Sequence, residues 1–216
     1  MYYNNFMQYY KKMFLDIETI PAAGSDLVKL KDIYESKKKK YSLKGAKYSK
    51  KFQDFFEETN FSGSFGQILC LAYAINDEET QILTGKEVNI LKNFWDIAKD
   101  VHIFIGHNVM DFDLRFIYQR SVVLQTKPTK ELSFARYRSN PIFDTLREWQ
   151  HWGGGNGFDS LDALAKALDL PTSKQGIDGS QVYNFYQAGK LEEIYKYCKA
   201  DVDLTRKVYK RMTFEK

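Results

Sequence analysis

Short apolar runs along the chain predict a set of β-strands. Residues 13–17 (MFLDI) form one such run, which ends at Pro21 and the Ala-Ala-Gly-Ser that follows. Residues 67–75 (QILCLAYAI) and 80–83 form two more, separated by a polar turn, and this arrangement predicts a hairpin. Two further strands are predicted at residues 101–105 (VHIFI) and 141–143. These strands are expected to form one sheet.

Apolar residues at helical spacing predict helices between and after the strands. Residues 88–98 and 114–123 have this spacing, and Ser160 is placed to cap a helix at residues 160–168. Two more helices are predicted from residue 179 onward and over residues 191–212, the second of them long and amphipathic. The order of elements therefore predicts an α/β fold, a mixed β-sheet flanked by α-helices.

Length and composition favour one ordinary globular domain. The chain has 216 residues, 44% of them apolar and 28% charged, so we expect a single domain over residues 1–216. The longest apolar run, residues 68–75, is far too short to span a membrane. Two cysteines, without a CxxC motif, predict neither a disulfide framework nor a zinc site. A reducing cytoplasm is the expected location, with no membrane partner.

The net charge hides a strong local asymmetry. The chain has 32 basic and 28 acidic residues, a formal charge of +4. Residues 29–51 hold ten lysines against two acids, a local +8, so the rest of the chain sums to −4. This segment lies in a predicted insertion at about residues 25–62, where scattered apolar residues predict one or two short helices. A lysine-rich segment attached to a mildly acidic body requires an explanation.

Two carboxylates lie inside the first predicted strand. Asp16 and Glu18 are separated by Ile17, so the alternation of a strand points both acids to one face and Ile17 to the other. Two adjacent carboxylates repel each other, and a divalent cation would make their proximity tolerable. A strand end with one exposed face is the alternative explanation.

Two later segments carry acids where a functional site could form. Asn108 and Asp113 follow the strand at residues 101–105, at the edge of the sheet where α/β sites form, although capping of the next helix is a serious alternative. Tyr197 and Asp201 are four residues apart and share one face of the last helix. An ordinary amphipathic helix would also explain that second pair.

Taken together, the three segments predict a metal site. Asp16, Glu18, Asp113 and Asp201 supply hard oxygen ligands without sulfur or imidazole, a set that suits Mg²⁺ or Mn²⁺. Two such ions about 3.5–4 Å apart are a common arrangement for phosphodiester cleavage. The sequence therefore favours a phosphodiester hydrolase.

These segments resemble the DEDD family of 3′–5′ exonucleases, which has a ribonuclease H-like fold. LDIET, NVMDFD and YCKAD correspond to its three motifs, and Tyr197 is typical of the tyrosine subtype, DEDDy, found in proofreading domains of DNA polymerases. Residues 176–203, GHNVMDFDLRFIYQR and SLDALAKALDL are similar to a bacterial family of predicted exonucleases related to the exonuclease domain of B-family polymerases. The resemblance extends from about Phe14 to the C-terminus.

The resemblance implies a role for each catalytic residue. Asp16 would bridge two metal ions. Glu18 and Asp201 would complete the site of the ion that carries the attacking water. Asp113 would hold the second ion, and Tyr197 would orient the water.

The resemblance also implies contacts with the substrate. Ile17, Thr19 and Ile20 would touch the terminal nucleotide, with Phe112 beside them. Asn108 would hold either the substrate or its own loop.

Several other polar residues are expected to have structural roles. Asp111 and Asp203 lie outside the motif positions, and Asp203 faces another side of its helix. Asp144 is expected to cap a helix, and His107 to be structural.

The basic segments are candidates for contact with nucleic acid. Tyr34, Tyr41 and Tyr48 could stack on bases, with a solvated pair of helices as the alternative. Arg136 and Arg138, with Lys127 and Lys130, form a second basic loop with a similar interpretation. The residues expected to bind phosphates in the first segment are Lys37, Lys38, Lys39 and Lys40.

The predicted function is a metal-dependent 3′–5′ exonuclease. It would act on single-stranded or 3′-frayed nucleic acid, DNA above RNA, and release 5′-mononucleotides by a two-metal mechanism. An exoribonuclease of the same superfamily and a catalytically silent nucleic-acid-binding module are the alternatives. The sequence does not determine whether there is a protein partner.

Overall fold

A mixed five-stranded sheet forms the centre of the structure, a computed structural model that describes residues 10–155, 157–172 and 176–215. The strands are β1 (Lys12–Ile20), β2 (Gln67–Ile75), β3 (Gln81–Leu83), β4 (Ile103–Gly106) and β5 (Ile142–Asp144), in the order β3-β2-β1-β4-β5. Strand β1 pairs antiparallel with β2 and parallel with β4. Strands β4 and β5 are also parallel, so the carboxyl ends of β1, β4 and β5 meet at one edge.

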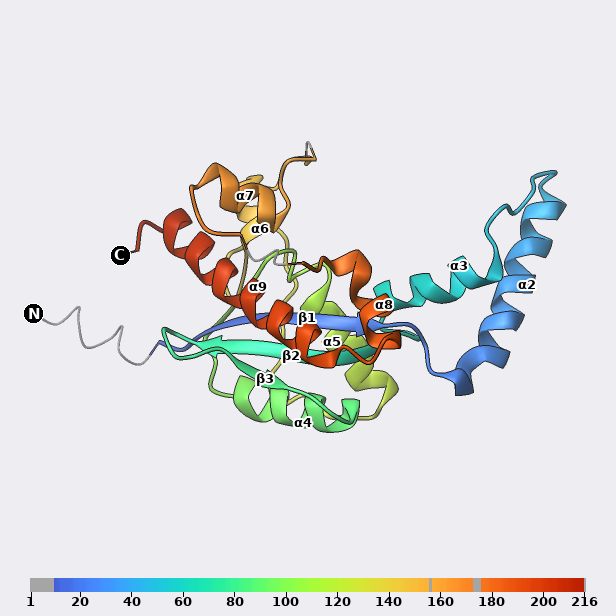
Figure 1. Cartoon of the computed structure of the whole chain (residues 1–216), viewed down its shortest axis with the longest axis horizontal. Helices are drawn as coiled ribbons and strands as arrows, with labels where there is room; N and C mark the ends of the chain where they lie inside the picture. Colours follow the sequence, from blue (N-terminus) through green and yellow to red (C-terminus); the bar gives the residue numbers. More distant parts are fainter. Residues whose placement is uncertain (1–9, 156, 173–175, 216) are drawn as a thin grey trace, which may run out of the picture.

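Helices cover both faces of this sheet. Helices α4 (Glu87–Ala98) and α5 (Asp113–Val123) pack on one face, where Met13, Leu15 and Ile17 of β1 enter the core. Helices α8 (Val182–Gln187) and α9 (Leu191–Met212) pack on the other face, which receives Phe14. Figure 1 shows α9 crossing the sheet obliquely over β1 and β2. The predicted fold class, a ribonuclease H-like mixed sheet flanked by helices, is confirmed.

Two short helices pack against α9. Helix α6 (Thr145–Trp149) follows β5 directly, and the Asp144 side chain caps it. Helix α7 (Leu161–Ala167) begins after Ser160, whose hydroxyl accepts a hydrogen bond from the Ala163 N–H as predicted. The sequence indicated helix α6 only through the expected cap at Asp144, because its five residues are too few for a periodic pattern.

The insertion forms an arm that projects from the sheet. We define the arm as residues 24–61; it contains α2 (Leu27–Leu43) and α3 (Phe52–Glu57), with a short 3₁₀ helix at each end. Figure 1 shows α2 standing clear of the body beyond the end of β1. The sequence predicted one or two short helices here, but α2 is 17 residues long. Lysine has a high intrinsic helix propensity, and Tyr34 packs this helix against Tyr48 and Phe52 of the returning chain.

Two hydrogen bonds anchor the base of the arm to β1 and to the residues directly after it. The Thr19 hydroxyl donates to the Asn60 carbonyl at 2.7 Å, and the Ala22 N–H donates to the Thr59 hydroxyl at 2.9 Å. Leu30 is the one buried residue of α2. The arm is therefore held at its base, next to the end of β1 that carries Glu18.

Other predicted elements match closely. Strand β2 and helix α9 have the predicted bounds, and β2 and β3 form the predicted hairpin. Strand β1 extends beyond the expected residue 17 to Ile20, because pairing with β2 continues to that point. Among the described residues, no helix is long and apolar enough to cross a membrane.

Candidate functional site

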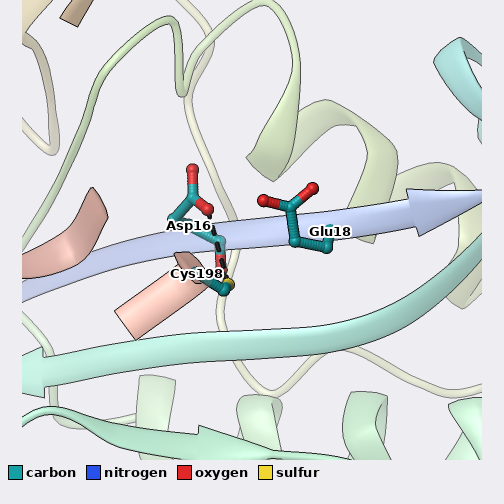
Figure 2. Close-up of side chains that lie close together, drawn as sticks. All are labelled: Asp16, Glu18 and Cys198. Atoms are coloured by element: carbon teal, nitrogen blue, oxygen red, sulfur yellow. Dashed lines mark hydrogen bonds between the residues drawn. The ribbon is translucent and has the colours of Figure 1, made fainter. Parts of the chain in front are cut away.

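Strand β1 carries two carboxylates on one face. Figure 2 shows the side chains of Asp16 and Glu18 rising on the same side of the strand, as the alternation predicted. Ile17 between them is buried in the core on the opposite face. Asp16 is half-buried and Glu18 is 8% exposed. Strand geometry alone therefore brings the two acids together.

The pairing of β1 with β2 is irregular at this point. Glu18 lies opposite Cys70, whereas the next residue, Thr19, lies opposite Ile68, so one residue of β2 has no partner. Such a bulge bends a strand and changes the direction of its side chains, and bulges are common beside active sites. The irregularity lies between Glu18 and the base of the arm.

Asp113 joins the pair from the beginning of α5. Its side chain is 2% exposed, and Oδ1 accepts a hydrogen bond from the Ile17 N–H at 3.0 Å. This bond ties the second motif directly to the backbone between Asp16 and Glu18. Helix capping was the rival explanation for Asp113, and its carboxylate, in the first turn of α5, accepts a hydrogen bond from its own backbone N–H as well as from that of Ile17.

Asp144 holds the loop that delivers Asp113. Its Oδ1 accepts hydrogen bonds from the N–H groups of Asn108 and Leu146, and its Oδ2 from that of Met110. The Arg147 N–H donates to the same carboxylate. The predicted capping role is confirmed, and the structure adds that this carboxylate also orders the loop before α5.

Helix α9 contributes the third group of side chains. Asp201 is 9% exposed and lies close to the Asp16 and Glu18 carboxylates. Tyr197, one turn earlier and half-buried, hydrogen-bonds to Asp201. The spacing of four residues therefore places both side chains at the same cluster, as the sequence predicted.

The electrostatics of the cluster are those of buried, mutually repelling acids. Burial raises the pKa of Asp16 well above its usual range, and the charges of Asp113, Glu18 and Asp201 raise it further. Burial also raises the pKa of Glu18. The pKa of Asp113 rises to about 7, mainly through burial, although the hydrogen bond from Ile17 lowers it. Each acid would bind a proton or a cation strongly.

The donor set fits a divalent cation. Ligand atoms of Asp16, Glu18 and Cys198 all lie within 4.8 Å of one another. Within the described part of the chain, no lysine or arginine forms an ion pair with Asp16, Glu18 or Asp113. Buried carboxylates without a basic partner are costly unless a metal ion compensates them.

Cys198 is the member of this cluster that the sequence did not suggest. Its thiol donates to the Asp16 backbone carbonyl at 3.5 Å and to Asp16 Oδ2 at 3.4 Å, the contact drawn in Figure 2. Burial raises the pKa of this thiol, so it remains a donor at neutral pH. The only sequence signal was its position directly after Tyr197, where an apolar role in the core was equally reasonable.

The acids expected to be structural have other partners. Asp111 forms ion pairs with Arg115 and Arg147. Asp203 accepts hydrogen bonds from Thr80 and Arg206. His107 lies 3.0 Å from the Thr145 hydroxyl, and burial lowers its pKa to about 4, so it is neutral at physiological pH.

The residues predicted to touch substrate differ in burial and in how they face the carboxylates. Only the backbone of Ile17 faces the cluster, because its side chain is in the core. Thr19 and Ile20 continue β1 toward the arm and are largely buried. Asn108 and Phe112 are half-buried in the loop before α5, and Asn108 has a positive φ of 61°. Their contact with substrate remains a prediction.

The four lysines predicted to bind phosphates are all exposed on α2 but do not share a face. Consecutive helical residues point in directions about 100° apart, so the four cannot all face one strand. Lys38 forms an ion pair with Glu35 at 3.1 Å and lies over the Tyr34 ring at 5.4 Å. Lys39 is the neighbour of Lys38 and points in yet another direction. Contact with nucleic acid stays a prediction for each of the four residues, Lys37, Lys38, Lys39 and Lys40.

The second set of candidate nucleic-acid contacts lies outside the arm. Arg136 and Arg138 are exposed in the loop before β5. In that loop, Asn140 donates to Tyr10, which precedes β1, whereas the ring of Tyr137, between the two arginines, packs against that of Trp152, which follows α6. Contact of these arginines with nucleic acid remains a prediction.

The tyrosines of the arm mostly contact one another. Tyr34 and Tyr48 have ring centroids 5.6 Å apart, and Tyr34 also packs against Phe52 at 5.4 Å. Tyr41 lies 5.1 Å from Tyr48 but is 45% exposed. A small aromatic cluster therefore holds α2 against the returning chain, and Tyr41 retains the most accessible ring.

Comparison with known families gives one match. The model of a family described as predicted 3′–5′ exonucleases related to the exonuclease domain of PolB matches residues 68–216, well over half of the chain. Asp113, Tyr197 and Asp201 lie inside the matched residues, whereas Asp16, Glu18 and the arm precede them. A comparison with curated proteins gives no match.

A comparison with solved structures gives a wider likeness in fold. The family B DNA polymerase from the hyperthermophilic archaeon Pyrobaculum calidifontis aligns with 94% of this chain, with a TM-score of 0.64 and 14% sequence identity. The aligned part is 24% of the polymerase chain, so this chain spans about a quarter of that protein. The likeness therefore includes the arrangement of strands and helices that brings the carboxylates together.

Proposed function

Because the chain belongs to the family of predicted 3′–5′ exonucleases related to the exonuclease domain of PolB, we propose that it removes nucleotides from the 3′ end of single-stranded or frayed DNA. The products would be 5′-mononucleotides. The observation that carries this proposal is the cluster of four acids that β1, α5 and α9 bring together, in which Asp16, Glu18 and Asp113 have no basic partner among the described residues.

The four acids are suited to hold two divalent cations. Asp16, Glu18, Asp113 and Asp201 would be the ligands, and oxygen ligands of this kind favour Mg²⁺ or Mn²⁺. When bound, such ions would activate the attacking water and stabilise the leaving 3′ oxygen. Asp16 is central among the four, because the other three acids all raise its pKa.

Tyr197 is proposed to orient the water that attacks the phosphodiester. Burial, followed by the charge of Asp201, raises the pKa of this phenol, so its hydroxyl keeps the proton at neutral pH. A protonated hydroxyl beside the cluster can donate a hydrogen bond or accept one, which is enough to position a water molecule. This role would place the chain in the tyrosine subtype, DEDDy.

The terminal nucleotide is proposed to lie along the end of β1. The backbone at Ile17, with Thr19 and Ile20, borders the acids on one side, and the loop carrying Asn108 and Phe112 borders them on the other. Both borders are held in place, because residues 17–20 of β1 pair with β2 and Asp144 holds the loop. Rigid positioning of the scissile bond is a main source of catalytic rate.

The choice of DNA rests on the polymerase likeness alone. A family B DNA polymerase shares the fold, and its substrate is the nearest chemical guide. An exoribonuclease on the same fold would differ in how its pocket accommodates a 2′-hydroxyl. Matched DNA and RNA strands of equal length and sequence, assayed side by side, test this directly. We expect faster loss of the DNA strand, and preferential degradation of RNA would overturn the choice.

Removal of Asp16 tests the catalytic proposal. A 5′-labelled oligonucleotide with Mn²⁺ should shorten stepwise with wild-type protein. The Asp16→Ala variant should lose more activity than the roughly 10–100-fold that loss of a residue supporting a metal ligand causes. The matched control is Asp203→Ala, which removes an acid of the same helix as Asp201 that faces Thr80 and Arg206 instead. Equal activity in Asp16→Ala and the control would refute the assignment.

Polarity and metal dependence separate an exonuclease from a silent binding module. Blocking the 3′ end should stop degradation, whereas blocking the 5′ end should not. Chelation with EDTA should abolish cleavage, and Mg²⁺ or Mn²⁺ should restore it. A protein that binds the strand equally well in EDTA and never shortens it with either metal would be a binding module.

A further inference from the structure

A groove on the arm is lined by lysines and, among the described residues, by no acid. It lies between the end of α2 and the chain that returns toward α3, and its walls include Lys37, Lys40 and Lys44 from the helix and its C-cap, and Lys47 and Lys50 from the return. The first three lysines follow one another at intervals of three and four residues, so they share one face of α2. The fold thus gathers five positive charges that the sequence distributes over positions 37–50.

The groove uses only part of the lysine run. Lys37 and Lys40 line it, whereas Lys38 and Lys39 lie on other faces of the helix and are not among its walls. Lys38 is also paired with Glu35. The site therefore follows the helical spacing of the lysines and not their order in the sequence.

Most of the charges in the groove are not neutralised within the protein. Lys50 pairs with Glu58, and Lys37 lies over the Phe55 ring at 5.0 Å. In the described residues, Lys40, Lys44 and Lys47 take part in no ion pair. Exposed ammonium groups without acidic partners on a shared groove repel one another, and binding of a polyanion would relieve that repulsion.

The aromatic cluster gives the groove a fixed shape. Tyr48 packs against Tyr34 and Tyr41, and the Tyr34 hydroxyl donates to the Lys50 carbonyl at 2.8 Å. These contacts hold the returning chain against α2. Tyr41 also lines the groove, with its ring 45% exposed, and could stack on a base.

The arm leaves the body next to the acid cluster. Only Thr19, Ile20 and three further residues separate Glu18 from its beginning at Gly24, and Thr19 is hydrogen-bonded to its base. In Figure 1 the arm continues beyond the end of β1. A strand whose 3′ end lies at Asp16 and Glu18 would therefore find the arm beside its path.

We propose that this groove is a second nucleic-acid site, which binds the phosphates of a single strand upstream of the 3′-terminal nucleotide. Lys40, Lys44 and Lys47 contact phosphates without reading sequence, and Tyr41 stacks on a base. The proposal rests on the proposed function for the direction of the strand. In this proposal the arm binds the single strand, and the acids of the body cleave its 3′-terminal phosphodiester bond.

Neutralising the groove tests the proposal by its salt dependence. The variant is the triple substitution Lys40→Gln, Lys44→Gln, Lys47→Gln, all on exposed positions of the arm. The probe is fluorescein-labelled dT30 in EDTA, which prevents cleavage, with anisotropy read at several salt concentrations. Each lost phosphate contact lowers the slope of log K against log salt by about 0.7 for single strands, so we expect a decrease of about 2. If the two curves meet near 1 M salt, this decrease corresponds to about a hundredfold weaker binding near 0.1 M.

A matched control removes the same charge elsewhere. Lys86→Gln, Lys92→Gln, Lys99→Gln changes three exposed lysines at and beside α4, which packs on the face of the sheet opposite α9. This variant should keep the wild-type slope. An unchanged slope in the arm variant, or an equal decrease in both variants, would overturn the proposal. Equal weakening for a duplex of the same length and for dT30 would overturn the assignment to a single strand.

A small substrate separates the arm from the catalytic site. The p-nitrophenyl ester of thymidine 5′-monophosphate is too short to reach the arm, so its turnover with Mn²⁺ should be the same in the arm variant and in wild type. On dT30 the arm variant should show a higher KM with little change in kcat. If wild-type protein cleaves neither substrate, the exonuclease proposal fails, while the salt slope still decides whether the arm binds nucleic acid.

Discussion

At the scale of single residues, the acid cluster places charges where the fold disfavours them. Burial and mutual repulsion raise the pKa values of Asp16, Glu18 and Asp113 together. Residues held this way lower the stability of a protein and are retained where function needs them. Two residue-scale predictions follow from this cost.

The first concerns the dependence of stability on pH without metal. The folded pKa of Asp113 is about 7, against an ordinary value of 3.8. Between pH 3.8 and about 7, the Asp113 carboxyl is therefore protonated in the folded state and ionised in the unfolded state. Stability in EDTA should therefore fall as pH rises through that window. Asp113→Asn keeps the acceptor for the Ile17 N–H but carries no charge, so its melting temperature should fall less over the same pH window. Thermal melts in EDTA measure this, and identical slopes in the two proteins would contradict it.

The second concerns the thiol beside Asp16. The Cys198 hydrogen bond favours the charged form of that carboxylate, which is the form that binds a cation. Cys198→Ala should weaken Mn²⁺ binding by about tenfold, the lower end of the effect of losing a partner of a metal ligand. Cys198→Ser retains a donor and should bind Mn²⁺ more tightly than the alanine variant. Calorimetric titration with Mn²⁺ measures both, and wild-type affinity in Cys198→Ala would show that the thiol only fills space.

At the scale of elements, the position of each carboxylate is set by the strand, helix or loop that carries it. The alternation of β1 fixes Asp16 and Glu18, the helical turn of α9 fixes Tyr197 and Asp201, and a loop held by Asp144 fixes Asp113. The loop is the least regular of these supports, because it has no repeating backbone pattern and relies on one buried carboxylate.

Substitution of that carboxylate should be costly for the shape of the loop. Asp144→Asn replaces one acceptor oxygen with an NH₂ group, which is a donor. This donor would face either the Met110 N–H or the N–H groups that now bond to Oδ1, and those groups would lose their acceptor. A buried donor left without an acceptor costs about 1–3 kcal/mol, so the free energy of unfolding in urea should fall by that amount. Asp96→Asn, an exposed position on α4, is the control and should not shift. Because Asp113 follows the same loop, Mn²⁺ affinity should fall as well.

At the scale of the whole molecule, the chain separates into a body and an arm of opposite character. The body contains the core and the acids, whereas α2 has one buried residue and carries exposed lysines. A segment with few buried contacts opens more readily than a core. That residues 1–216 form one functional domain stays a prediction.

Limited digestion with trypsin should reveal this difference. The first cuts should fall within residues 29–51, where ten lysines lie on an arm anchored at its base. Excess dT30 in EDTA should slow these cuts without changing those in the body. Mass spectrometry identifies the sites, and initial cleavage at exposed body lysines such as Lys92 would contradict the expectation.

The sequence predicted the regular part of the molecule well because its signals are local. The apolar run of β2 and the long stripe of α9 led to the correct bounds, and period two placed Asp16 and Glu18 on one face. The motif segments also identified the family, although the family match begins only at residue 68. Helix α6 was indicated only by its cap at Asp144, and its bounds were not predicted because five residues are too few for a periodic pattern.

What the sequence alone determined is which residues can act and on which elements they lie. Tertiary structure decided how they meet, because contacts between distant segments leave no local pattern. The Ile17 N–H reaches Asp113 across 96 positions, and the Cys198 thiol reaches Asp16 across 182. The lysine-rich segment was likewise visible as a charge of +8, but only the return of the chain against α2 gathers Lys40, Lys44 and Lys47 into one groove.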